Sequence, residues 1–457
     1  MIAAYLLWAA PLTLGQAVER AAQNDSTLTS LAAQTSGAEA GASALRANYG
    51  PKLRLEGNVV VWDSAQTVSF ASSGGGAGFP ALPPPAANDP YQQAVAGIVQ
   101  ALAGLGQPTT VRDQVTASAT VQIIQPLLGL IAVNQALDVA QLNTQASRLQ
   151  SETRRRRVEL DTVQGYYRTL QAQALARAAV QQVESLEAQE KKVLSLQANG
   201  VIGRNEVLRL QVALAAARQQ VFSVQGMVQQ AQAALAMQVG GTPGETFELQ
   251  AEPDDAATPE ALPALDRARE SARTERPELA ELRARVDQSR EGVDVARVKL
   301  LPDLNLIGQY QHTEGNSFSA ADSLFAGLFL TWTAWEWGAT SHQVEVASAQ
   351  EDATRAMLVQ AEKGVGLEVE AAHVQFRTAD GAISVAREAV AQAEEALRLE
   401  RARLEAQQST TTDLLNAETA LLQARVNLEN ARHERLIARA RLRAAMGLTV
   451  LSSGVKP

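Results

Sequence analysis

The sequence predicts a mixed α+β membrane protein, in which a duplicated unit supplies four transmembrane β-strands and long coiled-coil α-helices per protomer. Three observations predict this class: an internal repeat, short segments in which apolar and polar residues alternate, and long proline-free stretches rich in Ala, Gln, Glu, Arg and Leu. No apolar run is long enough for a transmembrane helix. Strands would therefore have to make any crossing of a membrane.

The repeat relates residues 12–248 to residues 264–448. Leu14 aligns with Leu265, an offset of 251, and Glu206 aligns with Asp413, an offset of 207. The two offsets differ by 251 − 207 = 44 residues, which an insertion in the first copy explains. The prediction begins with a residual signal-like segment, 1–11, and repeat 1 at 12–248. Repeat 1 contains a helix, a strand, the insert 70–112, a second strand, a long helix and a return helix. A linker, 249–263, leads to repeat 2 at 264–448, which has the same order without the insert and is followed by a tail, 449–457. An apolar lead-in to the first helix is the alternative for 1–11.

Alternation of apolar and polar residues predicts the strands. It is clear in 53–59, 116–123 and 304–311 and weaker in 324–332. One apolar and one polar face fit a membrane barrel with lipid outside and water inside. Four strands cannot close a barrel, and open edges do not survive in hydrocarbon, so other subunits would have to complete the cylinder.

Aromatic residues lie near the predicted strand ends and are candidates for an interfacial girdle, with ordinary packing at the junctions as the alternative: Trp62, Tyr310, Trp332, Trp335 and Trp337.

The insert is rich in Gly and Pro at first and then has helical apolar spacing over 91–106. It is predicted to be an extracellular surface loop, in preference to a segment that folds back to cap or plug the mouth.

The proline-free stretches predict helices over about 126–200 and 338–407, each spanning on the order of 100 Å at 1.5 Å per residue. The return helices show apolar residues at alternating spacings of three and four, as in Val207, Leu210, Leu214 and in Leu414, Ala417, Leu421. This spacing indicates a left-handed coiled coil. A soluble two-helix coiled coil would show the same seam.

Composition excludes several functions. A net charge of −9 and a pI near 5.2 argue against nucleic-acid binding. The absence of cysteine excludes disulfides, zinc–thiolate sites and cysteine nucleophiles. The chain has no His-x-x-x-His pair, phosphate-binding glycine loop or nucleophile elbow. The sequence therefore predicts no catalytic residue, no cofactor and no metal, and a protein that is not an enzyme.

Several loose motifs, in duplicated order, resemble the TolC-like outer membrane efflux protein family (outer membrane factors). They are the Leu-x-x-Ala helix starts at Leu14 and Leu265, the Pro-x-Leu strand starts at Pro51 and Pro302, the strand exits 125–128 and 334–338, and the helical return 200–206. The resemblance implies a trimer with a twelve-stranded β-barrel in the cell outer membrane and a large periplasmic α-helical barrel.

The function that the resemblance implies is a passive exit duct of a tripartite efflux or type I secretion system. Its partners would be two further copies of the chain, outer-membrane lipid, a periplasmic adaptor (membrane fusion protein), and an inner-membrane pump or ABC exporter. The alternative is a periplasmic adaptor or structural coiled coil, which would typically have one helical hairpin instead of two.

The resemblance also implies roles for residues at the helical returns. Asp413 and Glu206 correspond to acidic residues at the periplasmic entrance, and Asn416 stands where the family has a second aspartate. Gly200 and Val201 resemble the tip that meets the adaptor, with Gln407 and Gln408 at that place in repeat 2. The tyrosine and arginine of the family's gating links fall at Leu404 and Ser409, so this sequence departs from that latch.

Threefold symmetry would bring three copies of Asp413 around one axis. Their mutual repulsion would raise the carboxylate pKa and favour cations. The alternative is that Glu206 and Asp413 are first-turn acids at helix N-termini, with Thr410, Thr411 or Thr412 as caps.

Overall fold

The computed structural model describes residues 11–68, 90–105, 109–242, 244–250, 262–316, 320–406 and 408–451. Nearly all of the signal-like segment 1–11, most of the linker 249–263, the end of the tail and Gln407 lie outside the described residues. The proposed domain boundaries therefore remain predictions.

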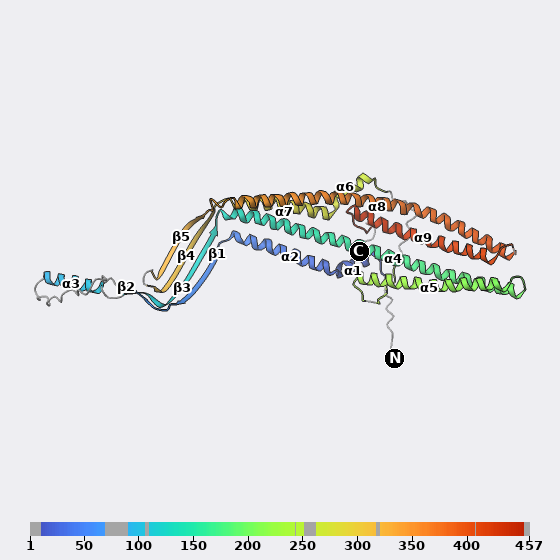
Figure 1. Ribbon diagram of the computed structural model, residues 1–457, viewed down its shortest axis with the longest axis horizontal. Helices are drawn as coiled ribbons and strands as arrows, with labels where there is room; N and C mark the ends of the chain where they lie inside the picture. Colours follow the sequence, from blue (N-terminus) through green and yellow to red (C-terminus); the bar gives the residue numbers. More distant parts are fainter. Residues whose placement is uncertain are drawn as a thin grey trace, which may run out of the picture. The chain divides into compact units, whose positions relative to one another are not determined.

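Among the described residues, the α-helices and strands of both halves have the same order except for β2 and α3, which occur in the first half only (Figure 1). The first half comprises α1 (Leu14–Asn24), α2 (Ser26–Arg46), the short 3-10 helix η1 (Ala47–Tyr49), β1 (Lys52–Val61), β2 (Gln66–Val68), α3 (Pro90–Leu105), β3 (Thr109–Pro126), α4 (Gly129–Ala198) and α5 (Arg204–Gln238). The second comprises α6 (Leu265–Glu275), α7 (Pro277–Val298), β4 (Asp303–Asn316), β5 (Asp322–Thr331), α8 (Ala339–Glu405) and α9 (Thr411–Ala445). The predicted mixture of long helices and antiparallel strands is confirmed.

The structure refines the prediction in two places. The leading helix of each repeat is broken in two, at Asp25 between α1 and α2 and at Arg276 between α6 and α7. The insert contains the helix α3 within its described part, and the short strand β2 lies directly before the insert.

The chain divides into two compact units. The first comprises Met1–Ala40, Ala140–Arg290 and Ser348–Pro457, and the second comprises Gly41–Val139 and Glu291–Ala347. None of the helices in the described part of the chain combines the length and the apolar character required to cross a membrane.

The second unit is built around an antiparallel sheet. Its described strands have the order β1-β3-β4-β5, and β2 pairs with β3. The strands form where the sequence alternates, because alternating side chains suit the two faces of a pleated strand. Glycine at 315 has φ +78°, and a Cβ there would lie 2.4 Å from the Val115 carbonyl oxygen. Only glycine fits this approach of β4 to β3.

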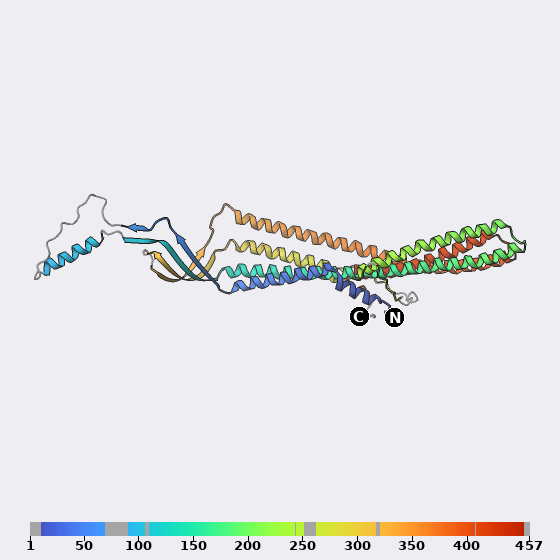
Figure 2. The ribbon, with the colours of Figure 1, turned by 90° about the horizontal axis from the view of Figure 1, so that it is seen from below.

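The first unit packs its helices through the heptad seams. Val193 on α4 and Val207, Leu210 and Leu214 on α5 share one buried cluster. Leu397 on α8 packs with Leu414 and Leu421 on α9 in another. Small and branched side chains at alternating spacings of three and four allow this close approach. Figure 2 shows α4 and α5 running antiparallel from a tight turn, and Figure 1 shows the same for α8 and α9.

Candidate functional site

Two features of the structure can be tied to function: the two-faced sheet of the second unit and the turns of the helical hairpins in the first unit. Each feature lies within one unit.

The register of the sheet puts apolar side chains together on one face. Leu55 pairs with Val121, Val121 with Tyr310, and Tyr310 with Leu324. Residues directly opposite each other in antiparallel strands project to the same face. This row is open to the surroundings, and Leu324 is 80% exposed. The chain thus presents a broad apolar surface that its described residues do not cover.

The other face of β1, β3 and β4 is mostly polar, whereas β5 adds Phe325 and Phe329 to it, opposite Gln309 and Asn305. The Gln122 amide donates to Gln309 at 3.3 Å, Gln309 to Gln311 at 3.3 Å, and Gln311 to Thr313 at 3.3 Å. Further along, the Ser118 hydroxyl donates to Asn58 at 2.8 Å. A ladder of amides and hydroxyls is a surface that water can solvate. Over β1, β3 and β4 the sheet therefore separates an apolar side from a mostly hydrophilic side.

The sheet is not closed in the single chain. Among the described strands, β1 and β5 are the edges, and each pairs on one side only. An edge of ten residues exposes a row of unpaired backbone donors and acceptors. Such an edge is a template for pairing with another chain.

Three of the predicted girdle residues lie between β5 and α8. The rings of Trp335 and Trp337 meet edge to face with centroids 5.7 Å apart, and Trp337 is 87% exposed. Trp337 has φ +56°, which is unfavourable for a bulky side chain. The Trp332 indole donates to the Leu300 carbonyl at 3.2 Å.

The remaining two girdle candidates differ from each other. Tyr310 lies on the apolar face and donates its hydroxyl to Asp322 at 2.6 Å. The Trp62 indole donates a hydrogen bond to the Thr116 hydroxyl. Thr116 pairs with Val60 across the strands, on the polar face of the sheet. The Arg112 guanidinium lies over the Trp62 ring, 3.8 Å from its centroid. This geometry does not favour an interfacial role for Trp62. The girdle stays a prediction.

The first hairpin turns at the predicted tip. Gly200 has φ +74°, and its N–H donates to Gln197 at 2.9 Å. The N–H of Val201 donates to Leu196 at 2.9 Å, while its side chain remains exposed. In the second hairpin the N–H of Gln408 donates to Arg403 at 2.8 Å. The structure brings these residues to the turns, and their contact with an adaptor stays a prediction.

Asp413 closes a capping box at the start of α9. The Thr410 hydroxyl donates to Asp413 at 2.7 Å and the Thr410 N–H donates to the same oxygen at 3.1 Å, while the Asp413 N–H returns a bond to Thr410 at 3.2 Å. The Thr410 hydroxyl, followed by the Thr410 N–H, holds the pKa of Asp413 below its usual value. The first-turn interpretation therefore describes the single chain. A ring of three carboxylates, with a raised pKa, stays a prediction for an assembly.

The other two entrance candidates have different surroundings. Asn416 lies one turn beyond Asp413. Glu206 lies 3.7 Å from Arg209, and its second carboxylate oxygen is buried without a hydrogen-bond partner among the described residues. Thr411 is buried, and Thr412 accepts a hydrogen bond from Arg209 at 2.8 Å, so neither serves as the cap. Ser409, at the family's arginine position, donates to Glu400 at 2.7 Å.

Sequence reasoning missed a buried ion pair near the turns. Glu418 on α9 is 2% exposed and accepts hydrogen bonds from Arg401 on α8 at 2.7 Å and from Ser185 on α4 at 3.0 Å. The pair thus joins both hairpins of the first unit. The signal that could have revealed it is the place of Glu418 directly after the seam residue Ala417, where a charge borders the apolar seam.

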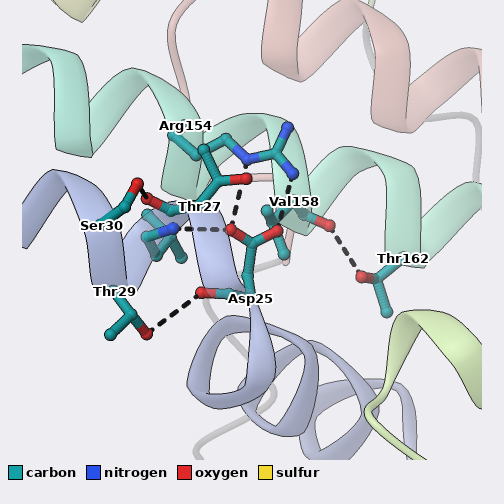
Figure 3. A network of polar contacts seen from close by, with 8 residues as sticks. Asp25, Thr27, Thr29, Ser30, Arg154, Val158 and Thr162 are labelled. Atoms are coloured by element: carbon teal, nitrogen blue, oxygen red, sulfur yellow. Dashed lines mark hydrogen bonds and ion pairs between the residues drawn. The ribbon is translucent and has the colours of Figure 1, made fainter.

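A second ion pair fixes the break between α1 and α2 (Figure 3). Arg154 on α4 donates to Asp25 at 2.7 Å, and the N–H of Leu28 donates to the same carboxylate at 2.7 Å. Arg154 is the main reason that the pKa of Asp25 is lowered. In the described part of the chain, no group of three or more His, Asp or Glu side chains is arranged to hold a metal ion.

Comparisons with known proteins agree with these features. Residues 268–448 match a family model described as outer membrane efflux protein. No curated protein matches the chain. Over 95% or more of this chain, the fold is similar to three solved structures. CusC has a TM-score of 0.76 and 15% identity, with 92% of that chain covered. The outer membrane protein VceC of Vibrio cholerae has a TM-score of 0.72 and 17% identity, with 97% of that chain covered, and the MtrE outer membrane channel of Neisseria gonorrhoeae has a TM-score of 0.72 and 18% identity, with 89% of that chain covered.

These comparisons carry two conclusions. The resemblance to the TolC-like outer membrane efflux protein family is confirmed by sequence over residues 268–448. Over nearly the whole chain, the solved structures show a similar fold. The family description agrees with the predicted location in the outer membrane.

Proposed function

We propose that this chain, whose second repeat carries the outer membrane efflux protein domain, assembles as a trimer into a channel through the outer membrane. Its sheet lies in the membrane and its long helices form a tube in the periplasm. The channel is the passive exit duct of a tripartite efflux or type I secretion system. A periplasmic adaptor and an inner-membrane pump or ABC exporter supply the driving force.

The two-faced open sheet is the observation that carries this proposal. Three copies of the four long described strands would give 3 × 4 = 12 strands, with β1 of one copy pairing with β5 of the next. Closure would satisfy the backbone groups of both edges, as hydrocarbon requires. The apolar face would then touch lipid, and the ladder of amides would line a water-filled lumen.

The long helices support the same assembly. On α8, Val365, Val369 and Ala372 are buried within the chain, whereas Leu367 is 69% exposed. Val374 and Val385 continue the exposed stripe at spacings of seven and eleven residues, which return to the same side of a helix. A helix with apolar stripes on two sides needs neighbours on both sides. Adjacent copies in a helical wall would provide the second neighbour.

The turns of the hairpins form the periplasmic entrance in this proposal. Asp413 and Glu206, with Asn416 beyond them, line the narrowest part, and three copies of Asp413 focus a negative potential on the axis. Gly200, Val201, Gln407 and Gln408 meet the adaptor. Trp332, Trp335 and Trp337, together with Tyr310, lie at the membrane interfaces, where amphipathic rings are favoured.

Single-channel recording in planar bilayers tests the proposal. The trimer should conduct with a preference for cations and should be blocked by divalent cations, because the carboxylates lie at the constriction. Asp413→Asn keeps a side-chain oxygen that can accept the capping bonds but removes the charge, so it should weaken both properties. Asp352→Asn, which removes an exposed charge from α8 away from the turns, is the matched control and should change neither.

The possible results separate the two parts of the proposal. A trimer that conducts with unchanged selectivity after Asp413→Asn would contradict the carboxylate ring but not the channel. A reconstituted trimer that carries no current would contradict the channel itself.

A further inference from the structure

Helix α3 is an apolar helix whose first part is largely exposed in the described chain. Its 16 residues, Pro90–Leu105, include no Asp, Glu, Lys or Arg. Residues 90–98 are all exposed or half-buried, and Ile98 is 60% exposed. An isolated helix of this length is marginally stable in water, and its stability normally comes from packing of an apolar face. The helix therefore needs a surface to pack against.

The spacing of its large apolar residues indicates what that surface is. Tyr91, Val95 and Ile98 follow one another at intervals of four and three residues, and the sequence repeats this spacing with leucine at positions 102 and 105. This is the heptad spacing by which helices pack against one another in a bundle. Gln93 falls on the opposite side of the helix. The stripe is suited to other helices of the same kind.

The charge of the segment argues against a lipid surface as the partner. Helices that lie on membranes carry Lys and Arg on their polar face to attract anionic lipid. Helix α3 has none, and glutamine takes their place. The same neutrality removes any repulsion between copies that approach closely.

Chain connectivity lets α3 reach the axis of a trimer. Only three residues separate Leu105 from Thr109, the first residue of β3. Four peptide units span at most about 14 Å. A barrel of twelve tilted strands has a radius of roughly 12 Å. The end of α3 can therefore lie at the centre of the opening from which β3 starts.

We propose that the α3 helices of three copies pack on the threefold axis as an apolar three-helix bundle that obstructs the outer opening of the channel. This inference rests on the proposed trimer. It reverses the sequence-based preference for a surface loop over residues 70–112, since the described part of that insert supplies a helix with a packing stripe.

Cysteine cross-linking tests the bundle, and the chain contains no native cysteine that could interfere. In the full-length trimer in detergent, Ile98→Cys should form a disulfide-linked dimer on oxidation, because three thiols around one axis can join only in pairs. Gln93→Cys is the matched control on the opposite side of α3 and should remain monomeric on a denaturing non-reducing gel.

The outcomes distinguish this inference from the proposed function. A heat-sensitive trimer in which Ile98→Cys does not cross-link, or in which both variants cross-link equally, overturns the bundle and leaves the channel standing. A second test attaches a fluorophore to the thiol of the Ile98→Cys variant in liposomes that contain lipid-attached quenchers. Quenching of the fluorophore would also overturn the bundle, because it would place α3 on a membrane surface. Absence of the trimer before any oxidation would contradict the proposed function instead.

Discussion

The two repeats hold their leading helices against their long helices with ion pairs of opposite polarity. The offset of 251 makes Asp25 and Arg276 equivalent, and both stand at the break of a leading helix. Asp25 accepts a hydrogen bond from Arg154 on α4, whereas Arg276 donates one to Glu368 on α8, each at 2.7 Å. The distances agree and the charges are exchanged, but the partners on the long helices are not equivalent, since the offset of 207 puts Arg154 opposite Ala361. Both repeats thus have an ion pair at the break of the leading helix, with a different sign and a different partner position.

The hairpins differ more deeply. The offset of 207 places Leu194 and Gln211 of the first hairpin opposite Arg401 and Glu418 of the second. The first hairpin therefore has an apolar and an amide side chain where the second has its buried ion pair. Helix α5 is preceded by Gly203 at its N-cap position, which has no side chain to cap it, while α9 starts with a complete capping box. The second hairpin has the more strongly fixed turn.

The largest expected effect comes from Arg401→Ala. It leaves the carboxylate of Glu418 buried without its cation, and removing one partner of a buried pair costs about 3 kcal/mol in the free energy of unfolding. The equivalent change in the first hairpin, Leu194→Ala, should cost about 1 kcal/mol because only half-exposed apolar area is lost. Denaturant unfolding in detergent measures both. Equal losses would contradict the asymmetry, and Glu418→Leu added to Arg401→Ala should recover most of the stability.

The charge-exchanged pairs should also differ in strength. The Arg276 side chain is 6% exposed and also donates to the Ala445 carbonyl at 2.7 Å, whereas the Arg154 side chain is 33% exposed. Arg276→Ala should therefore lower the free energy of unfolding by about 2 kcal/mol and Arg154→Ala by about 1 kcal/mol. Thermal unfolding followed by circular dichroism checks the order. A larger loss for Arg154→Ala would show that burial does not set the ranking.

The caps offer a smaller contrast. Thr410→Ala should destabilise the first turn of α9 by about 1 kcal/mol. Gly203→Ser should add a capping hydroxyl to α5 and stabilise its first turn by a few tenths of about 1 kcal/mol. Hydrogen exchange of the amides at 411–414 and 204–207 reads each turn separately. No change in protection at α9 after Thr410→Ala would contradict the capping role.

The smallest effect is a dependence on pH. Because Arg154 lowers the pKa of Asp25 in the folded state, the ion pair contributes stability that is fully present above the unfolded pKa of about 3.9. That contribution is lost as the pH falls through the folded pKa. Asp25→Asn should therefore lower the unfolding temperature at neutral pH but flatten its decline below about pH 4. If the unfolding temperature of the variant declined at low pH as steeply as that of the unchanged protein, Asp25 would not contribute to the pH dependence of stability.

Periodicity in the sequence was sufficient for the long elements. Alternation found the long strands, and the absence of proline found α4 and α8. The break at Asp25 was missed because nothing near it excludes a continuous helix, although Pro277 at the start of α7 marks the equivalent break in repeat 2. Glu418 was missed because it lies beside Ala417, a residue of the predicted seam, and was not itself assigned to the seam. The trimer cannot be derived from one chain, since its contacts involve surfaces that the chain leaves exposed.

The mass of the detergent-solubilised protein, measured before and after heating, tests the central claim most directly. An open two-faced sheet that is completed by two further copies predicts a strand-containing particle of three 48.6 kDa chains, which falls apart on heating. A monomer that stays folded and does not associate as its concentration is raised would contradict the account, since its apolar face and strand edges would then need no partner.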